Sequence, residues 1–252
     1  MRINNNIMSL NAQRHLGRNT TAQGKVLEKL SSGLAINRAA DDAAGLSISQ
    51  KMRHNIAALT RSSQNAQDGI SFLQAAEGAL DEVSNMLTKA TTLTEQLHDG
   101  ILDSDDETAI TNEITHLYTQ MNCIITETTF NSVTIFDNTL GFGINGTDST
   151  LDIGTAFGAL TQKTTVTETR ENVVSVNEVR SALGAQQNRL EFAKNNVDTN
   201  VENLSAAEAR IRDADMAKMM SEFTKYNILT QAATSMLAQA NSAPQSVLTL
   251  LQ

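Results

Sequence analysis

The chain has 252 residues, which is enough for one or two domains. Aromatic residues make up 4% of it and there is a single Pro, a composition that favours long helices over a bulky globular core. The formal charge of −9 argues against nucleic-acid or anionic-membrane partners, which need clustered Lys and Arg. A lone Cys123 excludes an intramolecular disulfide framework and a cysteine-rich metal site. No apolar run is long enough to span a bilayer, and the polar N-terminus predicts no cleavable secretory signal.

The first part of the chain is predicted to be helical. Residues 1–44 are amphipathic, but Gly17, Gly24, Gly33 and Gly45 interrupt the pattern. Further along, apolar residues recur in steps of three and four, which is the heptad signature of helices packed side by side at a shallow angle. This first seam is formed by Leu73, Ala76, Leu80, Val83, Leu87, Ala90, Thr94 and Leu97.

A shorter helix and a small β-hairpin are predicted next. Ser104 and Glu107 have the spacing of a capping box, and four apolar residues follow at helical intervals. Residues 128–172 lose the helical spacing, are rich in Thr and Gly, and alternate apolar and polar residues around Asn145-Gly146. This dipeptide favours a two-residue hairpin turn. The segment is therefore interpreted as an insert between two helical arms, residues 1–127 and 173–252.

The second arm repeats the three–four step over about six heptads. An ordinary amphipathic helix of a globular bundle would drift more over this length, so a coiled coil is favoured. This second seam contains Val176, Val179, Leu183, Gln186, Leu190, Ala193, Val197, Asn200, Leu204, Ala207, Ile211 and Ala214. An apolar face follows, formed by Met216, Met219, Phe223, Leu229, Ala233, Met236, Leu237 and Ala240.

These patterns predict a mainly α fold: an elongated antiparallel helical bundle or coiled coil with paired N- and C-terminal helices and a small β-hairpin insert. Residues 1–44 with 215–252 are predicted to form a discontinuous terminal domain, and residues 45–214, including 128–172, an outer helical domain. The terminal helices bury too little apolar surface in one molecule to offset the backbone entropy lost on ordering, so we expect them to fold when copies associate.

The residues expected to carry this packing fall into two groups. One group lies in the outer helical layer and the other on the Met-rich terminal face. They are Leu190, Val197, Leu204 and Ile211 in the first group, and Met216, Met219, Phe223, Met236 and Leu237 in the second.

Five blocks of sequence resemble bacterial flagellin, the subunit of the flagellar filament. They are LSSGLAINRAADDAAGLSIS at 30–49, NAQDGISFLQAAEGAL at 65–80, SALGAQQNRLE at 181–191, NLSAAEARIRDADMA at 203–217 and QAATSMLAQANSAPQSVLTLLQ at 231–252. They occur in the family's order, and with their intervening helices they cover about four-fifths of the chain. Two departures from the family are Cys123 and FNS at 130–132, where FNG is common.

The resemblance implies a self-assembling subunit of an extracellular flagellum used for motility. Its partners would be other copies of itself, the flagellar cap, junction proteins and an export chaperone, and it would leave the cell unfolded through a type III apparatus. Terminal helices would form an inner layer around the channel, with the longer helices outside. The resemblance also places contacts for a vertebrate Toll-like receptor on Lys89, Leu93 and Glu113, with Lys89 where the family has Arg.

Two structural alternatives remain at this point: a hook–filament junction protein, which has similar termini, and an intracellular coiled-coil scaffold. The latter would not need glycine-interrupted, Met-rich ends. An enzyme is the weakest hypothesis, because there is no Gly-rich phosphate loop and no nucleophile–base constellation. No catalytic, cofactor-binding or metal-binding residue is predicted. The four histidines, His15, His54, His98 and His116, are scattered along the chain.

Overall fold

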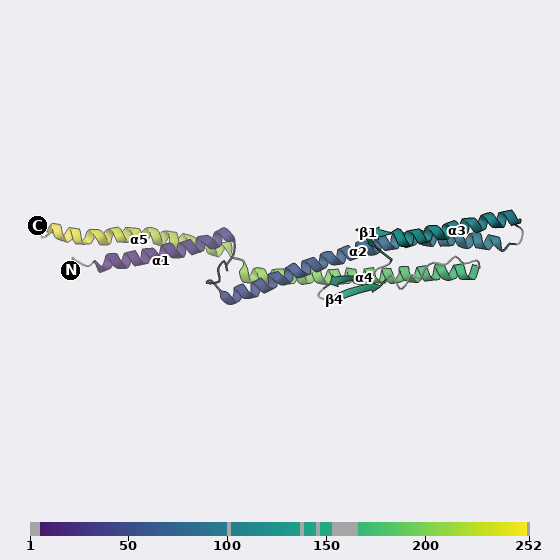
Figure 1. Ribbon diagram of the computed structural model, residues 1–252. Helices are drawn as coiled ribbons and strands as arrows, with labels where there is room; N and C mark the ends of the chain where they lie inside the picture. The colour runs from purple at the N-terminus through teal and green to yellow at the C-terminus, as the bar shows by residue number, and fades with distance from the viewer. Residues whose placement is uncertain (1–5, 100–101, 137–138, 145–146, 153–165, 251–252) are drawn as a thin grey trace. The chain divides into compact units, whose positions relative to one another are not determined.

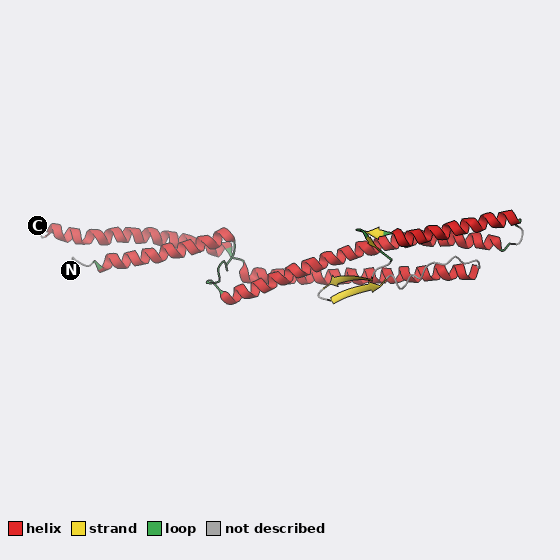
Figure 2. Ribbon diagram, in the orientation of Figure 1, coloured by secondary structure: helices red, strands yellow, loops and turns green. Residues whose placement is uncertain are grey.

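The computed structural model describes residues 6–99, 102–136, 139–144, 147–152 and 166–250, and for 139–144, 147–152, 166–168 and 244–250 it gives the backbone alone. Helices make up most of the described chain, as Figure 2 shows. The mainly α class predicted from the sequence is confirmed. The chain divides into two compact units, unit 1 with residues 1–55 and 203–252, and unit 2 with residues 56–202.

Unit 1 is built on two helices that lie side by side, α1 (Ile7–Ser32) and α5 (Met216–Leu250) (Figure 1). At one end, the amide of Asn6 donates to the carbonyl of Ala240 over 2.6 Å. At the other, the N–H of Ala214 donates to the carbonyl of Gly33 over 2.9 Å. The start of α1 therefore meets the end of α5, and the predicted antiparallel pairing of the terminal helices is confirmed.

The boundaries of α1 have local causes. Its first turn is capped by the side chain of Asn6, which accepts from the N–H of Ser9. Gly33 ends the helix in the left-handed region (φ 72°) while its N–H bonds to the carbonyl of Lys29. Gly17 and Gly24 were expected to interrupt the helical pattern, but α1 runs through both. The cost of about 1 kcal/mol for each helical glycine is small enough for pairing with α5 to override it.

The next helix, α2 (Ala43–Leu97), begins where the chain approaches itself closely. The carboxylate of Asp42 accepts from the N–H of Gly45 over 3.0 Å. A Cβ on Gly45 would clash with the Asp42 side chain and would lie 2.8 Å from Cδ1 of the buried Ile36. A side chain at this position in the first turn of α2 would therefore force the side chains of Asp42 and Ile36 to move.

Unit 2 contains most of α2, the helix α3 (Ser104–Glu127) and most of α4 (Val166–Arg212). The unit boundaries fall inside α2 and α4, whereas the domain limits expected from the sequence fall near the ends of these helices. Two details of the helices need correction. Residues 166–172 belong to α4 rather than to the insert, and the cap of α3 is Asp103, whose carboxylate accepts from the N–H of Ser104. Asp103, like Ser104, has a short side chain that accepts a hydrogen bond, and it lies one residue earlier. The helix therefore begins at Ser104, the residue that was predicted to cap it.

Contacts between α2 and α4 show that the two helices are antiparallel within unit 2. The hydroxyl of Ser63 donates to Asp198 over 2.6 Å, and Arg170 pairs with Glu95 over 2.9 Å. Residue numbers thus rise along α2 as they fall along α4. The residues of both predicted seams are buried or half-buried, with the exception of Asn200, which is exposed.

The core of unit 2 consists of two apolar clusters along α2. The first joins α2 to α4 and to the segment after α3, through Leu73, Leu80, Ile135, Phe136, Leu183, Leu190 and Val197 among others. The second joins α2 to α3 and the early part of α4, through Val83, Leu87, Leu93, Ile114, Tyr118, Met121 and Val176 among others.

Two small antiparallel hairpins follow α3. The strands β3 (Thr139–Ile144) and β4 (Thr147–Asp152) pair Ile144 with Thr147, which confirms the predicted hairpin. The predicted turn, Asn145-Gly146, lies outside the described residues. The sequence did not anticipate the other hairpin.

That other hairpin is formed by β1 (Thr129–Phe130) and β2 (Val133–Thr134). Its two turn residues, Asn131 and Ser132, have φ of 50° and 66°. Positive φ at both turn positions matches the right-handed twist of the flanking strands. The Phe130 ring meets the Phe72 ring edge to face, with centroids 5.8 Å apart, and so fixes the hairpin to α2.

Candidate assembly surface

Large apolar side chains that remain exposed concentrate in unit 1. Among the described residues, unit 1 exposes Ile7, Met8, Leu10, Leu27, Ile48, Met216, Met220, Ile228, Leu229 and Met236, whereas unit 2 exposes Phe130, Val133, Val174 and Phe192. Scattered exposed apolar residues are normal on a soluble protein, but a concentration of them marks an interaction surface. Unit 1 is therefore the candidate site of assembly.

The structure divides the predicted Met-rich face of α5 into two sets. Met219, Phe223 and Leu237 are half-buried, at the three–four spacing of a seam against α1. Met216 and Met236 are 47% and 61% exposed. The first set is therefore used within one molecule, and the second remains available to a neighbour.

Three further exposed apolar residues of α5 were not among the predicted packing residues. Met220 and Ile228 point away from the seam and were missed, while Leu229 was placed on the face without being assigned a packing role. With Met236 they leave apolar side chains on several sides of the helix, because their positions do not repeat at three–four intervals. The signal was available in the sequence: apolar residues of α5 also occur off the predicted face, at Met220 and Ile228, and a helix with apolar residues on several sides is normally enclosed by neighbours.

The four predicted packing residues on α4 lie in different environments. Leu190 and Val197 are 2% and 1% exposed and pack inside the first cluster of unit 2. Leu204 and Ile211 are half-buried in the part of α4 that belongs to unit 1. A single molecule thus already covers Leu190 and Val197, and only the latter pair has surface left to cover.

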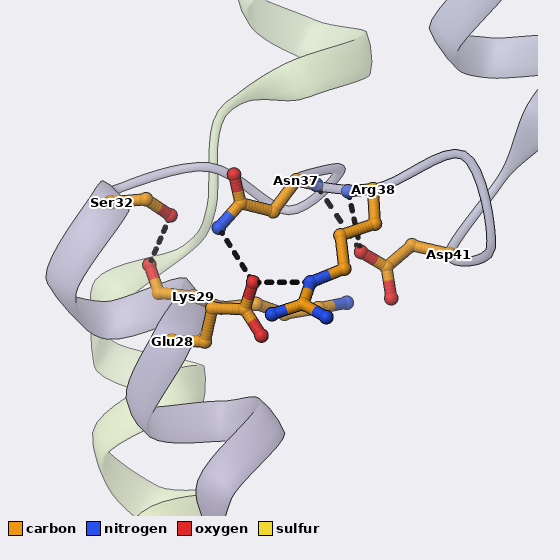
Figure 3. A network of polar contacts seen from close by, with 6 residues as sticks. All are labelled: Glu28, Lys29, Ser32, Asn37, Arg38 and Asp41. Carbon is orange, nitrogen blue, oxygen red and sulfur yellow. Dashed lines mark hydrogen bonds and ion pairs between the residues drawn. The ribbon is translucent and has the colours of Figure 1, made fainter.

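The loop after α1 is held by two carboxylates (Figure 3). Glu28 accepts from Nε of Arg38 over 2.7 Å and from the amide of Asn37 over 3.3 Å. Asp41 accepts from the backbone N–H groups of Asn37 and Arg38 over 3.2 and 3.1 Å. These bonds lower the pKa of Asp41, and the hydrogen bond to Glu28 raises the pKa of Arg38. The loop that joins α1 to α2 therefore has a defined shape.

Comparisons with known proteins identify the family. Residues 3–140 match the model of the bacterial flagellin N-terminal helical region, and residues 166–251 match the C-terminal helical region. The chain belongs to the bacterial flagellin family. It is 44% identical to a flagellin of Halalkalibacterium halodurans and 41% identical to a flagellin of Bacillus subtilis, with complete coverage of both chains in each case. It is also 39% identical, again over the whole of both chains, to a flagellar filament 31.3 kDa core protein of Treponema maltophilum.

Flagellins are a family of structural proteins. No helix among the described residues combines the length and apolarity needed to cross a membrane. Within the same described part, no group of three or more His, Cys, Asp or Glu side chains is placed to hold a metal ion. The lone Cys123 is half-buried on α3.

The residues implied in receptor contact by the flagellin resemblance are not equally accessible. Lys89 on α2 and Glu113 on α3 are exposed. Leu93 is 4% exposed and belongs to the second cluster of unit 2, where it packs with α3. Of these three residues, Lys89 and Glu113 are therefore accessible at the surface of the described chain, whereas Leu93 packs between α2 and α3.

Proposed function

We propose that this chain builds the flagellar filament by enclosing α5 and the apolar start of α1 between copies of itself. The observation that carries the proposal is the distribution of apolar side chains on α5. One side packs on α1, while Met220, Ile228, Leu229 and Met236 remain exposed around the rest of the helix. A second, third or further copy can cover these sides, and a single molecule cannot.

The same shortage of burial supports folding of the terminal helices on association. The buried apolar residues among the described part of unit 1 are Val26, Ile36 and Ala240. Each ordered residue loses about 1–2 kcal/mol of backbone entropy, which three buried side chains do not offset over so long a helix pair. Burial against neighbours supplies the missing stabilisation, so ordering and polymerisation are coupled.

Unit 2 would be folded before assembly, because its core is complete in one molecule. The family relationship further supports export of the unfolded chain to the cell exterior, with an export chaperone before secretion and a cap and junction proteins at the filament ends. The junction and scaffold alternatives are not favoured, since the full-length relatives are flagellins and filament core proteins.

The test places charges on the exposed apolar sides of α5. The double variant Ile228→Glu with Met236→Glu would bury unpaired carboxylates in the filament, which costs several kcal/mol. We expect it to stay monomeric in sedimentation and electron microscopy, while the thermal unfolding of unit 2 is unchanged. Trypsin should cut its terminal helices, as it should those of the parent monomer, and these sites should be protected in parent filaments.

A matched control adds the same two charges at polar positions of the same helix. Gln231→Glu with Gln239→Glu alters two exposed polar residues, each three positions after a residue of the test variant, and keeps every apolar side chain of α5. This control should polymerise far more readily than the apolar-face variant. Normal filaments from Ile228→Glu with Met236→Glu would contradict the enclosure of α5.

A further inference from the structure

The charge of the chain is divided unevenly between its two units. Residues 1–55 and 203–252 carry 12 Lys and Arg against 7 Asp and Glu, a formal charge of +5. Residues 56–202 carry 7 against 21, a formal charge of −14. Unit 1, which is proposed to assemble, therefore has a net positive charge although the whole protein is acidic.

Three of these cations form a stripe along α1. Arg14, Arg18 and Lys25 are all exposed, and their spacings of four and seven place them on one face of the helix. This face is turned away from α5, because the half-buried Leu16 and the buried Val26 occupy the other side. We call these three residues the cationic stripe.

Small residues lie between the cations of the stripe and leave this face of α1 open. They include Gly17 and Thr21, and a Cβ on Gly17 would meet nothing within 4 Å. Arg14 donates to the amide oxygen of Asn11. Within the described chain, no carboxylate forms an ion pair with any residue of the stripe.

The same unit carries four exposed carboxylates at one end. Leu34 and Asp213 form an isolated antiparallel bridge, which brings the loops 33–42 and 213–215 together. The carboxylates on these loops, which we call the acidic end, are Asp41, Asp42, Asp213 and Asp215. Four cations lie nearby: Arg38 is paired with Glu28, Lys29 adds its charge to the effects that lower the pKa of Asp41, Arg210 is exposed on α4, and the half-buried Arg212 is paired with Glu208.

One molecule cannot bring the two arginines of its cationic stripe to its own acidic end. Fifteen residues separate Arg18 from Gly33, and at about 1.5 Å of rise per residue the distance is roughly 22 Å along a straight helix. Arg14 lies further away still. Lys25 is near enough for its charge to add to the backbone hydrogen bonds that lower the pKa of Asp41, but it forms no ion pair there. Within the described part of one molecule the two guanidinium groups therefore have no carboxylate partner, and a neighbouring copy can supply one.

We propose that the cationic stripe of one copy docks against the acidic end of a neighbouring copy. The two surfaces have opposite charge, and both lie in the unit whose exposed apolar residues mark it as the assembly layer, so this inference rests on the proposed function. A contact between two different patches of the same molecule is heterologous and leaves one patch free at each end of a row. Where the rotation between successive copies does not close into a ring, such a contact extends into an open filament with two different ends.

The test is a charge exchange between two variants. The stripe variant carries Arg14→Glu, Arg18→Glu and Lys25→Glu. The end variant carries Asp41→Asn, Asp42→Asn, Asp213→Lys and Asp215→Asn, where Asn keeps the acceptors that cap the loop and the helices. Each variant alone should show a critical concentration for polymerisation about tenfold or more above the parent, because like charges then meet.

An equimolar mixture of the two variants distinguishes docking from a loss of folding. The negative stripe of the stripe variant then meets the positive end of the end variant. The unchanged cationic stripe of the end variant likewise meets the unchanged acidic end of the stripe variant. The mixture should therefore polymerise at a critical concentration close to that of the parent. A mixture that polymerises no better than its components would overturn the docking, as would normal polymerisation of either variant alone. Because the parent still polymerises, neither result would affect the enclosure of α5.

A matched control reverses three exposed cations of unit 1 outside the stripe, with Lys51→Glu, Arg53→Glu and Lys218→Glu. Its change in net charge equals that of the stripe variant. It should polymerise like the parent. An equal defect in this control would show that net charge, and not the position of the stripe, governs assembly, and the proposal would fail.

Discussion

The two units of the chain use the same helical spacing with opposite results. Unit 2 fills its seams: Leu73, Ala76, Leu80, Val83 and Leu87 are each at most 1% exposed. Unit 1 pairs α1 with α5 along a seam whose α1 side includes Ser9, Asn19 and Gln23, and many of its large apolar side chains are exposed on the other sides of these helices. A seam completed by three helices and a hairpin is self-sufficient, whereas one shared by two helices is not.

This difference shows how one sequence can encode a stable module and an assembly module. On the proposed function, the polar residues of the α1–α5 seam leave the terminal pair weakly held in the monomer, and the pair becomes ordered when copies associate. The exposed apolar residues on the same helices favour association, because they are buried when copies meet. The complete core of unit 2 keeps the rest of the molecule folded meanwhile.

The largest expected effect tests the core of unit 2. Leu80→Ala removes a fully buried side chain from the first cluster and should lower the free energy of unfolding by about 2–5 kcal/mol, from lost burial and the cavity that remains. In unit 1, Met220→Ala truncates a side chain that is 53% exposed and should change monomer stability by less than about 0.5 kcal/mol. Urea unfolding of both monomers gives the comparison, and equal losses would remove the distinction between the units.

A smaller, stabilising effect is expected at the turn between β1 and β2. Ser132 has φ of 66°, where a residue with a Cβ is strained by about 1–2 kcal/mol, while glycine loses about 0.5–1 kcal/mol more entropy on folding. Ser132→Gly should therefore stabilise unit 2 by roughly 0.5–1 kcal/mol in thermal unfolding. Asn131→Gly is the control: Asn tolerates positive φ, so its gain should be smaller. A destabilised Ser132→Gly would show that the serine side chain has another role.

The smallest effect concerns the polar contacts that flank the unit 2 seam. Ser63 donates to Asp198 over 2.6 Å and Lys194 pairs with it over 3.1 Å; these contacts lower the pKa of Asp198. A lowered folded-state pKa stabilises the protein above the ordinary carboxyl value of about 3.9, and the contribution is lost as the pH falls through the folded value. Ser63→Ala should therefore cost less than about 1 kcal/mol at pH 7, because the pair is exposed.

The same variant should lose less stability than the parent when the pH is lowered below about 4, since its Asp198 has a more ordinary pKa. Thermal unfolding between pH 2.5 and 7 measures both parts. Ser71→Ala is a suitable control, because its hydroxyl bonds to the carbonyl of Gln67 and to no carboxylate that the structure gives. A pH profile that is the same for Ser63→Ala and the parent would show that the Ser63 bond does not set the Asp198 pKa.

The sequence predicted the helices and their seams, because a three–four apolar repeat has a direct consequence for which residues are buried. It predicted the β3–β4 hairpin from alternation around a turn dipeptide. It missed the β1–β2 hairpin, since Asn131-Ser132 is a weaker turn signal than Asn-Gly. It also treated α5 as having a single apolar face, although Met220 and Ile228 lie off that face.

What the sequence determined by itself is the period of each helix and the family to which the chain belongs, because both are properties of residue order. Only the tertiary structure decided which apolar residues are already used. Leu190 and Met236 look alike as members of a heptad, yet one is 2% and the other 61% exposed. The physical reason is that burial depends on the number of neighbouring helices around a position, and spacing along one helix does not contain that number.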